Sequence, residues 1–418
     1  MSISINRGPS MKMKIVNIVC TILMLTAGTI YAMEPYEAVV ISPVADLLMY
    51  PINEFSKKYY HGLTYEQIPI SGTPVSCPRL HQLLANATVT VIKEMNDEVK
   101  VIIPHLVCIL KNGSRLSGYW MRKKDLMPLN DIPNAACVIP EPISMENPAP
   151  AQSVTLAQPW VEPITNTHFC VGTRFMSPGK EGKNYIIAVF DPIQKRYVKA
   201  LCPIKKCMAP PVKDSVAQRN QMLALLRSWI SKKTFIPYAF GGCSICTSIQ
   251  EPTKAHEKQM LLITGESEPY YEWAGHEKQY PKTGIDCSHL VLLAARMCGI
   301  PYECKNSLAA FTLLRPVTAQ DPLEQGDIIW IDKHLMIVAD LTRNTLIEAR
   351  SYESGYGKVH EIPLYEEFNG IKTYAQLMEC YLNNIDIERL NKDGSVQKRE
   401  LPDGSIQNTV KVKLLKLR

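Results

Sequence analysis

The sequence predicts an α+β fold in which a helix that carries a cysteine packs on an antiparallel sheet, with strand-rich segments before it. Three observations predict this class. An apolar run rich in Leu and Ala, 290–297, ends at Gly299 and is typical of a buried helix. Short strands and tight turns follow it over 323–349. Short β-like runs separated by turns also fill 36–130 and 164–212.

Composition places the chain among ordinary globular proteins. It has 418 residues, of which 46% are hydrophobic and 21% charged, so it can bury more than one core. The formal net charge of +6 is mild and compatible with work near anionic polymers. No basic patch interleaved with aromatic residues occurs, so the sequence does not predict nucleic-acid binding. It specifies no oligomeric state, and we expect a monomer.

The first 32 residues have the pattern of an export signal. Lys12 and Lys14 precede an uncharged, largely apolar run over 15–30, and the small residue Ala32 follows it. These are the basic, hydrophobic and cleavage regions of a signal peptide. We therefore expect a signal peptide over 1–32 and a periplasmic or secreted protein with no membrane span after cleavage. The alternative is a membrane anchor, but about 16 apolar residues fall short of the roughly 20 that a span needs.

Residues 33–130 are predicted to form a small β-barrel, because several short strands lie within this stretch. The predicted strands are 38–41, 46–50, 87–94, 99–104, 106–110 and 119–126. The stretch resembles a bacterial SH3-like domain. The segments that carry this resemblance are 44–47, 83–84, 87–91 and 118–121. By that resemblance Tyr119 or Trp120 could reach a substrate; the alternative places these aromatic rings in the core of the barrel.

The middle of the chain is predicted to hold a linker and a second barrel. Residues 131–163 are rich in Pro and are expected to lack regular structure, so we interpret them as an extended linker. Residues 164–212 again contain β-like runs, with a turn at Asp191-Pro192. These runs are 172–175, 185–190 and 196–201. We interpret this part as a second, smaller SH3-like barrel.

Residues 213–418 are predicted to form the C-terminal domain. Asp214 begins a helix with an apolar stripe. An insertion over 243–282 is polar and is expected to be a surface loop that borders the cleft. Near the end of the chain, Asp-Gly dipeptides at 393–394 and 403–404 predict hairpins.

The chain has 13 cysteines, and an oxidising compartment would permit disulfides. Setting aside Cys20, in the apolar run, and Cys287 leaves an odd number, so at least one thiol is unpaired. Cys243 and Cys246 form a lone C-x-x-C, which is weak evidence for zinc or for redox catalysis. We interpret this pair as structural or incidental, and we predict neither a metal site nor a cofactor.

Cys287 is the candidate nucleophile. Asp286 is the natural N-cap of the apolar helix, which places Cys287 in its first turn. Free backbone N–H groups and the positive end of the helix dipole stabilise a thiolate there. The alternative is a small buried residue that happens to lie at the start of a helix.

His334 is the candidate partner of the cysteine. A turn at Gly326-Asp327 leads into the strand 328–331, and His334 begins the second strand of a hairpin. A third strand, 345–349, contains Glu348, which points either into a cleft or outward. A helix-borne Cys that faces a sheet-borne His, oriented by a polar residue on the next strand, is the papain-type arrangement.

These motifs resemble those of the NlpC-type cell-wall cysteine peptidases. The family pattern is Asp-Cys-Ser-Gly at a helix start, then Gly-Asp, then His-Val-Gly, then a polar residue on the next strand. This chain has Asp-Cys-Ser-His at 286–289, Gly-Asp at 326–327, His-Leu-Met at 334–336, and Glu348. His289 and Met336 replace glycines, and Glu stands where the family usually has His, Asn or Gln.

The resemblance implies a papain-like catalytic domain with Cys287, His334 and Glu348 as its triad. A carboxylate at position 348 can still accept a hydrogen bond from the imidazole and would raise its basicity. The main alternative is a fold that has been kept while its activity was lost.

The resemblance also implies residues that bind the substrate. The family has a tyrosine near its nucleophile within Pro-Tyr-x-Trp-Gly-Gly, and Tyr238 takes that place; Tyr271, in the insertion, is the alternative. Members that require a free substrate N-terminus bind it with an acidic residue and a serine. Here Asn306 and Ser307 match those positions, and Asp286 remains as a carboxylate. The substrate-binding candidates are Tyr238, Asp286, Ser288, Asn306 and Ser307.

The predicted function is hydrolysis of γ-D-glutamyl-diamino acid bonds in peptidoglycan stem peptides, with peptidoglycan or a muropeptide as the partner. Two alternatives stay open. One is a catalytically inactive wall-binding protein, and the other is an amidase or acyltransferase on the same fold.

Overall fold

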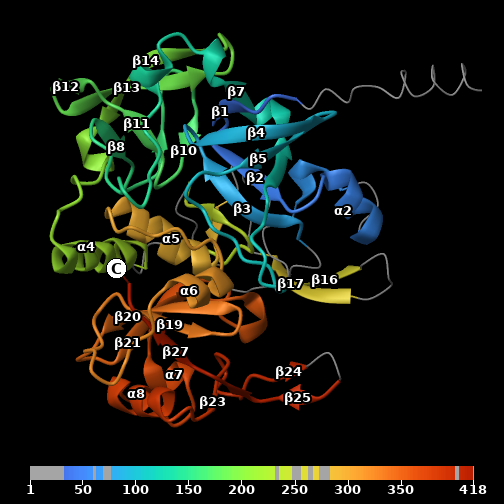
Figure 1. Ribbon diagram of the computed structural model, residues 1–418, viewed down its shortest axis with the longest axis vertical. Helices are drawn as coiled ribbons and strands as arrows, with labels where there is room; N and C mark the ends of the chain where they lie inside the picture. The colour runs from blue at the N-terminus through green and yellow to red at the C-terminus, as the bar shows by residue number, and fades with distance from the viewer. Residues whose placement is uncertain are drawn as a thin grey trace, which may run out of the picture. The chain divides into compact units, whose positions relative to one another are not determined.

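In the computed structural model of the protein (Figure 1), the described residues are 33–59, 63–68, 77–230, 235–246, 256–261, 267–272, 283–400 and 404–417. Met1–Pro35 form one unit of the chain and Tyr36–Arg418 a second. The signal peptide predicted for residues 1–32 lies outside the described residues. Within the part that the structure describes, no helix is both long enough and apolar enough to cross a membrane.

The first strands of the second unit form one seven-stranded antiparallel sheet in the order β3-β2-β6-β5-β4-β1-β7. Its strands are β1 Tyr36–Val40, β2 Val44–Leu48, β3 Arg79–Leu84, β4 Thr88–Met95, β5 Glu98–Ile102, β6 Tyr119–Arg122 and β7 Leu126–Pro128. Val89 and Val91 are fully buried and alternate with less buried neighbours along β4, as a strand with one core-facing side requires.

Most of the strands predicted here are present, with two differences. A helix, α2 Ile52–Tyr59, follows β2, and the stretch 106–110 makes only isolated bridges. Those bridges include a parallel one from Val107 to Cys304, so this stretch pairs with the C-terminal part of the chain rather than with its own sheet. The SH3-like assignment stays a prediction.

A second group of strands follows. These are β8 Ser153–Thr155, β9 Trp160–Val161, β10 His168–Phe169, β11 Arg174–Met176, β12 Gly179–Glu181, β13 Asn184–Asp191 and β14 Arg196–Pro203. Their core contains three aromatic rings, and those of Phe169 and Phe175 meet edge to face with centroids 5.0 Å apart. The three strands predicted for 164–212 correspond to β11, β13 and β14.

The stretch 131–163 was predicted to lack regular structure, and this was wrong in part. It contains the short helix α3 Ala135–Val138 and the strands β8 and β9. These strands pair with β11 and β10, which lie further along the chain. This Pro-rich stretch therefore forms strands of two or three residues, because short edge strands tolerate nearby proline.

The C-terminal part begins with three helices, α4 Ser215–Trp229, α5 Cys287–Met297 and α6 Ser307–Leu313. The side chain of Asp214 caps α4 as predicted, because it accepts a hydrogen bond of 2.7 Å from the Ala217 backbone N–H. A five-stranded antiparallel sheet follows in the order β22-β21-β20-β19-β27. Its strands are β19 Ile328–Ile331, β20 His334–Asp340, β21 Thr345–Ala349, β22 Val359–Pro363 and β27 Lys413–Leu415. The predicted α+β class with antiparallel sheets is thereby confirmed.

Helix α5 is the most enclosed element of the C-terminal part. Every residue from Cys287 to Ala295 is buried, because the helix is covered on several sides. It packs on β20 and β21, against α4, and near the loop of Gly172 (Figure 1). A stacked contact between His81 of β3 and His289 of α5, with ring centroids 4.4 Å apart, joins it to the first sheet.

The remaining elements are short. The insertion contains β15 Cys243–Ser244, which pairs with β18 Gly284–Ile285, and a hairpin of β16 His256–Leu261 and β17 Ser267–Glu272, so it is more than a loop. The tail contains α7 Leu364–Glu367, α8 Tyr374–Leu382, β23 Ile387–Glu388, β24 Arg399–Glu400, β25 Ile406–Gln407 and β26 Thr409–Val410. The pairing of β24 with β25 agrees with a predicted terminal hairpin.

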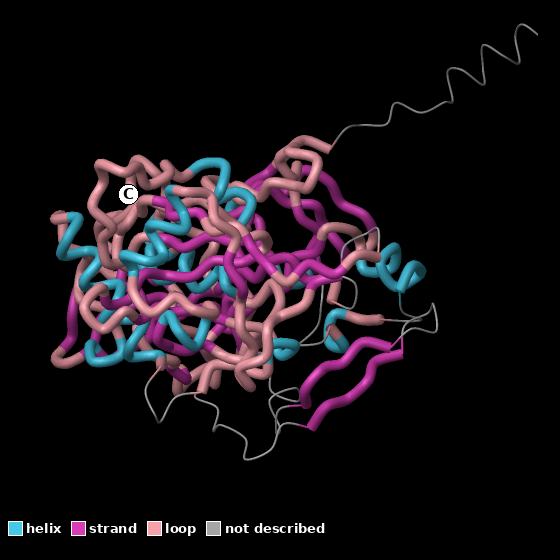
Figure 2. The backbone as a smooth tube through the Cα atoms, turned by 90° about the horizontal axis from the view of Figure 1, so that it is seen from below, coloured by secondary structure: helices cyan, strands magenta, loops and turns pink. Residues whose placement is uncertain are grey.

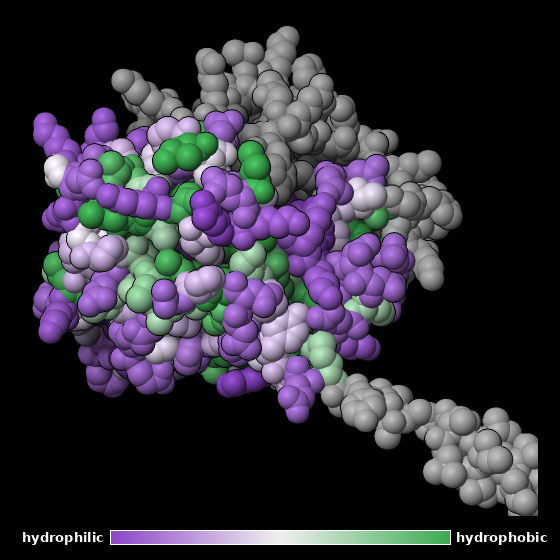
Figure 3. Space-filling view, turned by 90° about the horizontal axis from the view of Figure 1, so that it is seen from above, coloured by the Kyte–Doolittle hydropathy of each residue, from purple (hydrophilic) through white to green (hydrophobic). Residues whose placement is uncertain are grey.

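Strands contribute more of the regular structure than helices, as the tube in Figure 2 shows. On the face drawn in Figure 3, hydrophilic residues surround the hydrophobic ones that reach the surface. Some large apolar side chains are exposed; Ile164 and Ile193 lie in turns, and Val216 and Phe311 lie on helices. Such isolated apolar residues are normal on a protein surface.

Gly241 lies where the first sheet meets the segment before Cys287. Its φ is +67°, and a Cβ there would lie 2.7 Å from the carbonyl oxygen of Arg79. We expect Gly241→Ala to lower the free energy of unfolding by ~2 kcal/mol or more, because both the backbone conformation and the contact become strained. Urea denaturation followed by circular dichroism measures this loss.

Gly182 provides the matched control for that substitution. Its φ of +60° is similar, but a Cβ there meets nothing within 4 Å. Gly182→Ala should therefore show the cost of the backbone conformation alone. Equal losses in the two variants would contradict the close approach at Gly241.

Candidate active site

Cys287 is the first residue of α5, directly after the cap residue Asp286. The Asp286 side chain accepts hydrogen bonds of 2.8 Å from the His289 backbone N–H and from the Ser288 hydroxyl, both to Oδ1. Its Oδ2 accepts a hydrogen bond of 3.1 Å from the Gly241 backbone N–H. The predicted N-cap role is confirmed, and both carboxylate oxygens have protein donors.

His334 begins a strand, β20, that packs against the helix of Cys287. The turn at Asp332-Lys333 joins β19 to β20, with Lys333 at a φ of +68°, and His334 is the first residue of β20. The backbone N–H of Leu335, the following residue, lies close enough to Cys287 to oppose the rise in the pKa of its thiol, and β20 packs against α5. The hairpin thereby brings the start of β20 against the start of α5.

Glu348 lies on β21 and points inward, since its side chain is 0% exposed. Its Oε2 lies 2.6 Å from Nε2 of His334, and its Oε1 lies 2.9 Å from Nε2 of His360 on β22. Arg389 donates a hydrogen bond of 2.8 Å to the same Oε2. Of the two orientations that the sequence allowed for Glu348, the structure shows the buried one. With Nε2 bound to the carboxylate, Nδ1 is the ring nitrogen that is left for another partner.

A buried group of charges surrounds this contact. Arg389 and Arg350 both donate hydrogen bonds to Glu367, at the end of α7. Arg350 is also 3.8 Å from Glu348. Two guanidinium groups thus balance two carboxylates in an interior where a single unpaired charge would be costly. Sequence analysis missed His360, Arg350, Glu367 and Arg389. Arg389 lies 41 residues beyond Glu348, and the nearer residues belong to no motif that marks them as its partners.

Burial shapes the protonation of the two central groups. Cys287 is 8% exposed, and burial raises the pKa of its thiol to about 12; Asp286 adds to this, while the Leu335 N–H, Lys305 and Arg389 oppose it. Burial also lowers the pKa of His334 to about 4; Arg389 lowers it further, and Glu348 opposes this. The sequence predicted that the helix start stabilises a thiolate, but burial outweighs that effect. At neutral pH the thiol of Cys287 and the imidazole of His334 are therefore both expected to be uncharged.

Tyr238 lies near the start of α5, and its predicted role at the site stays a prediction. It makes a parallel bridge to Ile285, one residue before the cap. Its backbone carbonyl accepts a hydrogen bond of 2.8 Å from the Tyr352 hydroxyl. Burial and the nearby Cys287 both raise the pKa of the Tyr238 hydroxyl, so it remains a hydrogen-bond donor. The alternative, Tyr271, is in β17, whose side chains are outside the described structure.

The other substrate-binding candidates have structural partners. Asn306 caps α6 through a hydrogen bond of 3.0 Å from the Ala309 backbone N–H, and its amide donates to the carbonyl of Ile109 at 2.7 Å. Ser307 is half-buried, and its carbonyl accepts a hydrogen bond of 2.9 Å from the Trp330 indole. Ser288 donates to Asp286. Their roles in binding a substrate stay predictions.

The loop of Val107, between β5 and β6, packs against the segment that precedes α6. The Val107 backbone N–H bonds the carbonyl of Glu303 at 2.8 Å, and that of Lys305 bonds the carbonyl of Val107 at 2.8 Å. Tyr119 and Trp120 are both buried, which favours the core interpretation of these aromatic residues. The first part of the chain therefore borders the site through its loops rather than through these rings.

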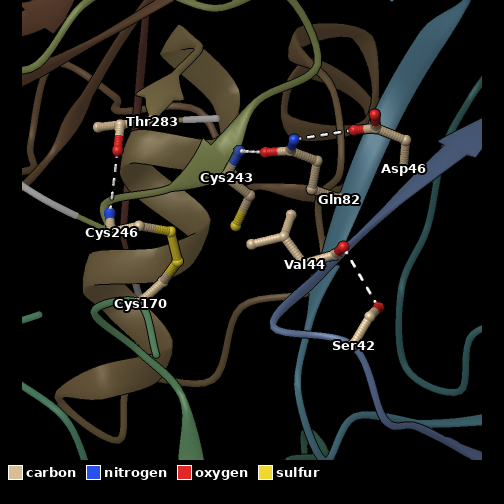
Figure 4. Close-up of a disulfide and its surroundings, with 8 residues drawn as sticks. All are labelled: Ser42, Val44, Asp46, Gln82, Cys170, Cys243, Cys246 and Thr283. Carbon is tan, nitrogen blue, oxygen red and sulfur yellow. Dashed lines mark hydrogen bonds between the residues drawn. A yellow bond between two sulfur atoms is a disulfide. The ribbon is translucent and has the colours of Figure 1, made fainter. Parts of the chain in front are cut away.

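A disulfide connects the second group of strands to the segment before the nucleophile. Cys246 of the C-x-x-C pair bonds Cys170, and its backbone N–H donates to the Thr283 hydroxyl (Figure 4). The backbone N–H of Cys243 donates to the side chain of Gln82 of β3 at 2.9 Å. The interpretation of the pair as structural is supported. Among the residues that the structure describes, no group of three His, Cys, Asp or Glu could hold a metal ion.

Comparisons with known proteins give structural neighbours only. No family model matches the chain, and no curated protein does. An NlpC/P60 family protein from Bacillus cereus is similar at 14% identity and a TM-score of 0.49, over 78% of this chain and 94% of that one. NlpC2 from Trichomonas vaginalis is similar at 11% identity and a TM-score of 0.29, over 79% of this chain and 93% of that one.

The peptidoglycan hydrolase RipB from Mycobacterium tuberculosis is similar at 20% identity and a TM-score of 0.22, over 37% of this chain and 66% of that one. All three TM-scores are below 0.5. The assignments that follow therefore rest on the motifs and the geometry of this chain.

His289 should make stability depend on pH. Burial lowers the pKa of His289 to about 4, below the ~6.5 of an unfolded chain, so the unfolded state binds more protons between these values. This contribution to stability is present above pH 6.5 and is lost as the pH falls. Between pH 7.5 and 5.5 we expect wild type to lose ~1 kcal/mol more than His289→Asn, measured by urea denaturation. Equal losses would contradict a buried, neutral His289.

Proposed function

We propose that the protein is an exported cysteine endopeptidase that cleaves γ-D-glutamyl-diamino acid bonds in peptidoglycan stem peptides. One observation carries the catalytic part. Glu348 holds Nε2 of His334 at 2.6 Å, and β20, the strand that His334 begins, packs against α5, the helix that Cys287 begins. This arrangement supports Cys287 as the nucleophile, His334 as the base and Glu348 as the orienting carboxylate.

The proposed chemistry follows from the hydrogen bond of His334 Nε2 to Glu348, which leaves Nδ1 of the same ring to act as the base. Nδ1 of His334 accepts the thiol proton as the sulfur of Cys287 attacks the carbonyl carbon, which avoids an isolated buried thiolate. The imidazolium then gives this proton to the leaving amine, and a thioester remains. His334 next removes a proton from water as the water attacks the thioester carbon. The C–S bond then breaks, the acid product leaves, and the imidazolium returns the proton to the sulfur of Cys287. Backbone N–H groups at the start of α5 and the Tyr238 hydroxyl stabilise the oxyanion.

Glu348 needs its own support to orient His334. A free carboxylate beside the ring would strongly favour the imidazolium and make it a weaker acid for the leaving amine. Arg389 and His360 both bind Glu348, so its charge is partly balanced and its geometry is fixed. In this proposal Glu348 orients the His334 ring as an uncharged Asn or Gln side chain at this position would.

The substrate class rests on the resemblance of the motifs. The order Asp286-Cys287-Ser288, then His334, then Glu348 follows the pattern of the NlpC-type peptidases, which act on cell-wall peptides. A γ-linked D-residue requires a shaped site, and the loops of the first sheet border this one. The net charge of +6 is compatible with an anionic wall polymer.

Hydrolysis of L-Ala-γ-D-Glu-diaminopimelate tests the proposal directly. We expect wild type to release diaminopimelate, detected by liquid chromatography with mass spectrometry. Cys287→Ala and His334→Ala should each reduce the rate by about 10³-fold or more, since each removes a group that acts at the reacting atoms. Glu348→Gln should reduce it by about 10-fold to 100-fold, because an orienting contact is weakened.

Cys137→Ala is the control, because Cys137 is exposed and lies in α3. It should keep the wild-type rate. If wild type releases no diaminopimelate and binds the peptide, the inactive wall-binding alternative is favoured. If it instead cleaves amide or acyl substrates that lack a γ-D-glutamyl bond, the amidase or acyltransferase alternative replaces the proposal.

A further inference from the structure

A cavity of about 160 Å³ lies where the first sheet, the second group of strands and α5 meet. Its walls come from β3 and β4, from Arg174 of β11 and from the second half of α5, which includes Arg296. Gln82 and Cys243, which are hydrogen-bonded to each other in Figure 4, also line it.

This cavity is separate from the candidate active site. None of Cys287, His334 and Glu348 lines it. The rise of an α-helix places Arg296 roughly 13 Å beyond Cys287 along the axis of α5. A ligand in the cavity would therefore occupy a second site.

The guanidinium group of Arg174 lies at the wall of the cavity. Its Nη1 donates a hydrogen bond of 2.7 Å to the carbonyl of Glu141, and its Nη2 donates one of 2.8 Å to the hydroxyl of Ser153. Glu141 lies between Pro140 and Pro142, which both line the cavity. These contacts hold the charged end of Arg174 through neutral acceptors.

The guanidinium group of Arg296 is held in a similar way. Its Nε donates a hydrogen bond of 3.1 Å to the carbonyl of Tyr302, and its Nη2 donates to the carbonyl of His105. His105 directly follows Pro104, which lines the cavity. Among the residues that the structure describes, Nη1 of Arg296 and Nε of Arg174 have no hydrogen-bond partner, so both groups keep donors for a ligand.

These two arginines differ from the others in lacking a counter-charge. In the described part of the chain, neither has a carboxylate within 4.0 Å, although both are half-buried. Every other described arginine that is not exposed is paired with a carboxylate. These are Arg79, Arg122, Arg219, Arg227, Arg350, Arg389 and Arg399.

Two unpaired cations that line one cavity favour an anion between them. Burial lowers the pKa of each guanidinium to about 10, and Arg296 lowers that of Arg174 further because the charges repel. An anion in the cavity would offset both the burial and the repulsion. The planar fork of a guanidinium matches the two oxygens of a carboxylate.

The rest of the lining indicates what carries the anion. Leu84, Ile103, Leu292, Leu293 and Met297 give the cavity apolar walls. A cavity of about 150 Å³ with such walls can hold a benzene molecule, so a ring-sized apolar body fits here. The lining thus combines an apolar volume with two cations.

We propose that this cavity binds a small organic carboxylate, with its charge held by Arg174 and Arg296 and its apolar body packed against the leucines of α5. Such a ligand would join β11 to α5 at a distance from Cys287. The proposal does not rest on the proposed hydrolysis, because it concerns a different site and a different ligand.

Benzoate and its uncharged analogue benzamide test the proposal by titration calorimetry at fixed ionic strength. We expect benzoate to bind wild type with a Kd of about 1 mM or lower, and at least 10-fold more tightly than benzamide. Arg174→Met and Arg296→Met should each weaken benzoate binding about 10-fold or more, since each removes a charge-assisted contact. Equal affinities for benzoate and benzamide would overturn the proposal.

Two further variants make the test independent of how the arginine variants fold. Thr88 lines the cavity and is half-buried, while its neighbour Val89 is fully buried on the other face of β4. Thr88→Phe should fill the cavity and abolish benzoate binding with both arginines in place. Arg196→Met is the matched control, because Arg196 is exposed and does not line the cavity, and it should keep the wild-type affinity. Unchanged benzoate binding in Thr88→Phe would contradict the assigned site.

Thermal stability and inorganic phosphate complete the test. Benzoate should raise the melting temperature of wild type but not of Thr88→Phe, with sodium chloride at equal ionic strength as the reference. Phosphate, which has no apolar body, should bind more weakly than benzoate. Phosphate binding that is as tight as benzoate binding would overturn the assignment of an organic carboxylate. Peptide cleavage enters none of these measurements, so they stand whether or not the protein is a peptidase.

Discussion

The burial of α5 is the constraint on which the rest of the structure depends. A helix that is apolar on nearly every side must be covered on every side, and no single sheet can do this. The C-terminal sheet covers one side, and α4, the loop of Gly172 and β3 contribute to the others. The first residue of this helix therefore lies where several parts of the chain meet, and that residue is Cys287.

The burial of this part of the structure also determines which side chains there can carry a charge. Water is largely absent around Cys287, His334 and Glu348, so each charge there must be balanced by another side chain. Arg389 and Arg350 supply this balance for Glu348 and Glu367, and both arginines come from outside the hairpin that carries the histidine. A neutral thiol at Cys287 and a neutral imidazole at His334 are the expected result.

The sequence predicted well those features that depend on local pattern. The cap at Asp286, the helix after it, the hairpin that starts at His334 and the strand of Glu348 all have signals within a few residues. It also predicted the α+β class and most strands upstream. Each of these depends on alternation, turn residues or capping, which neighbouring residues determine.

The features that it missed depend on residues far apart in the chain. The pairing of 106–110 with the segment after Tyr302 leaves no periodic trace, because the bridges are isolated. The charges around Glu348 come from strands and loops up to 41 residues away. Short strands in a Pro-rich stretch were missed because their partners, β10 and β11, lie further along. The sequence predicted a thiolate at the helix start. Burial by segments that are distant in the chain disfavours it, because burial raises the pKa of the Cys287 thiol.

The disulfide between Cys170 and Cys246 has a consequence for how the protein is made. Its cysteines are 76 residues apart and belong to separate parts of the fold, so correct pairing requires those parts to have met first. Ten further thiols occur in the described chain and can compete for oxidation before that encounter. If oxidation begins before these parts have packed together, mispaired disulfides compete with the native one, and disulfide exchange is needed to correct them. The native disulfide is therefore expected to form after these two parts of the chain have packed together.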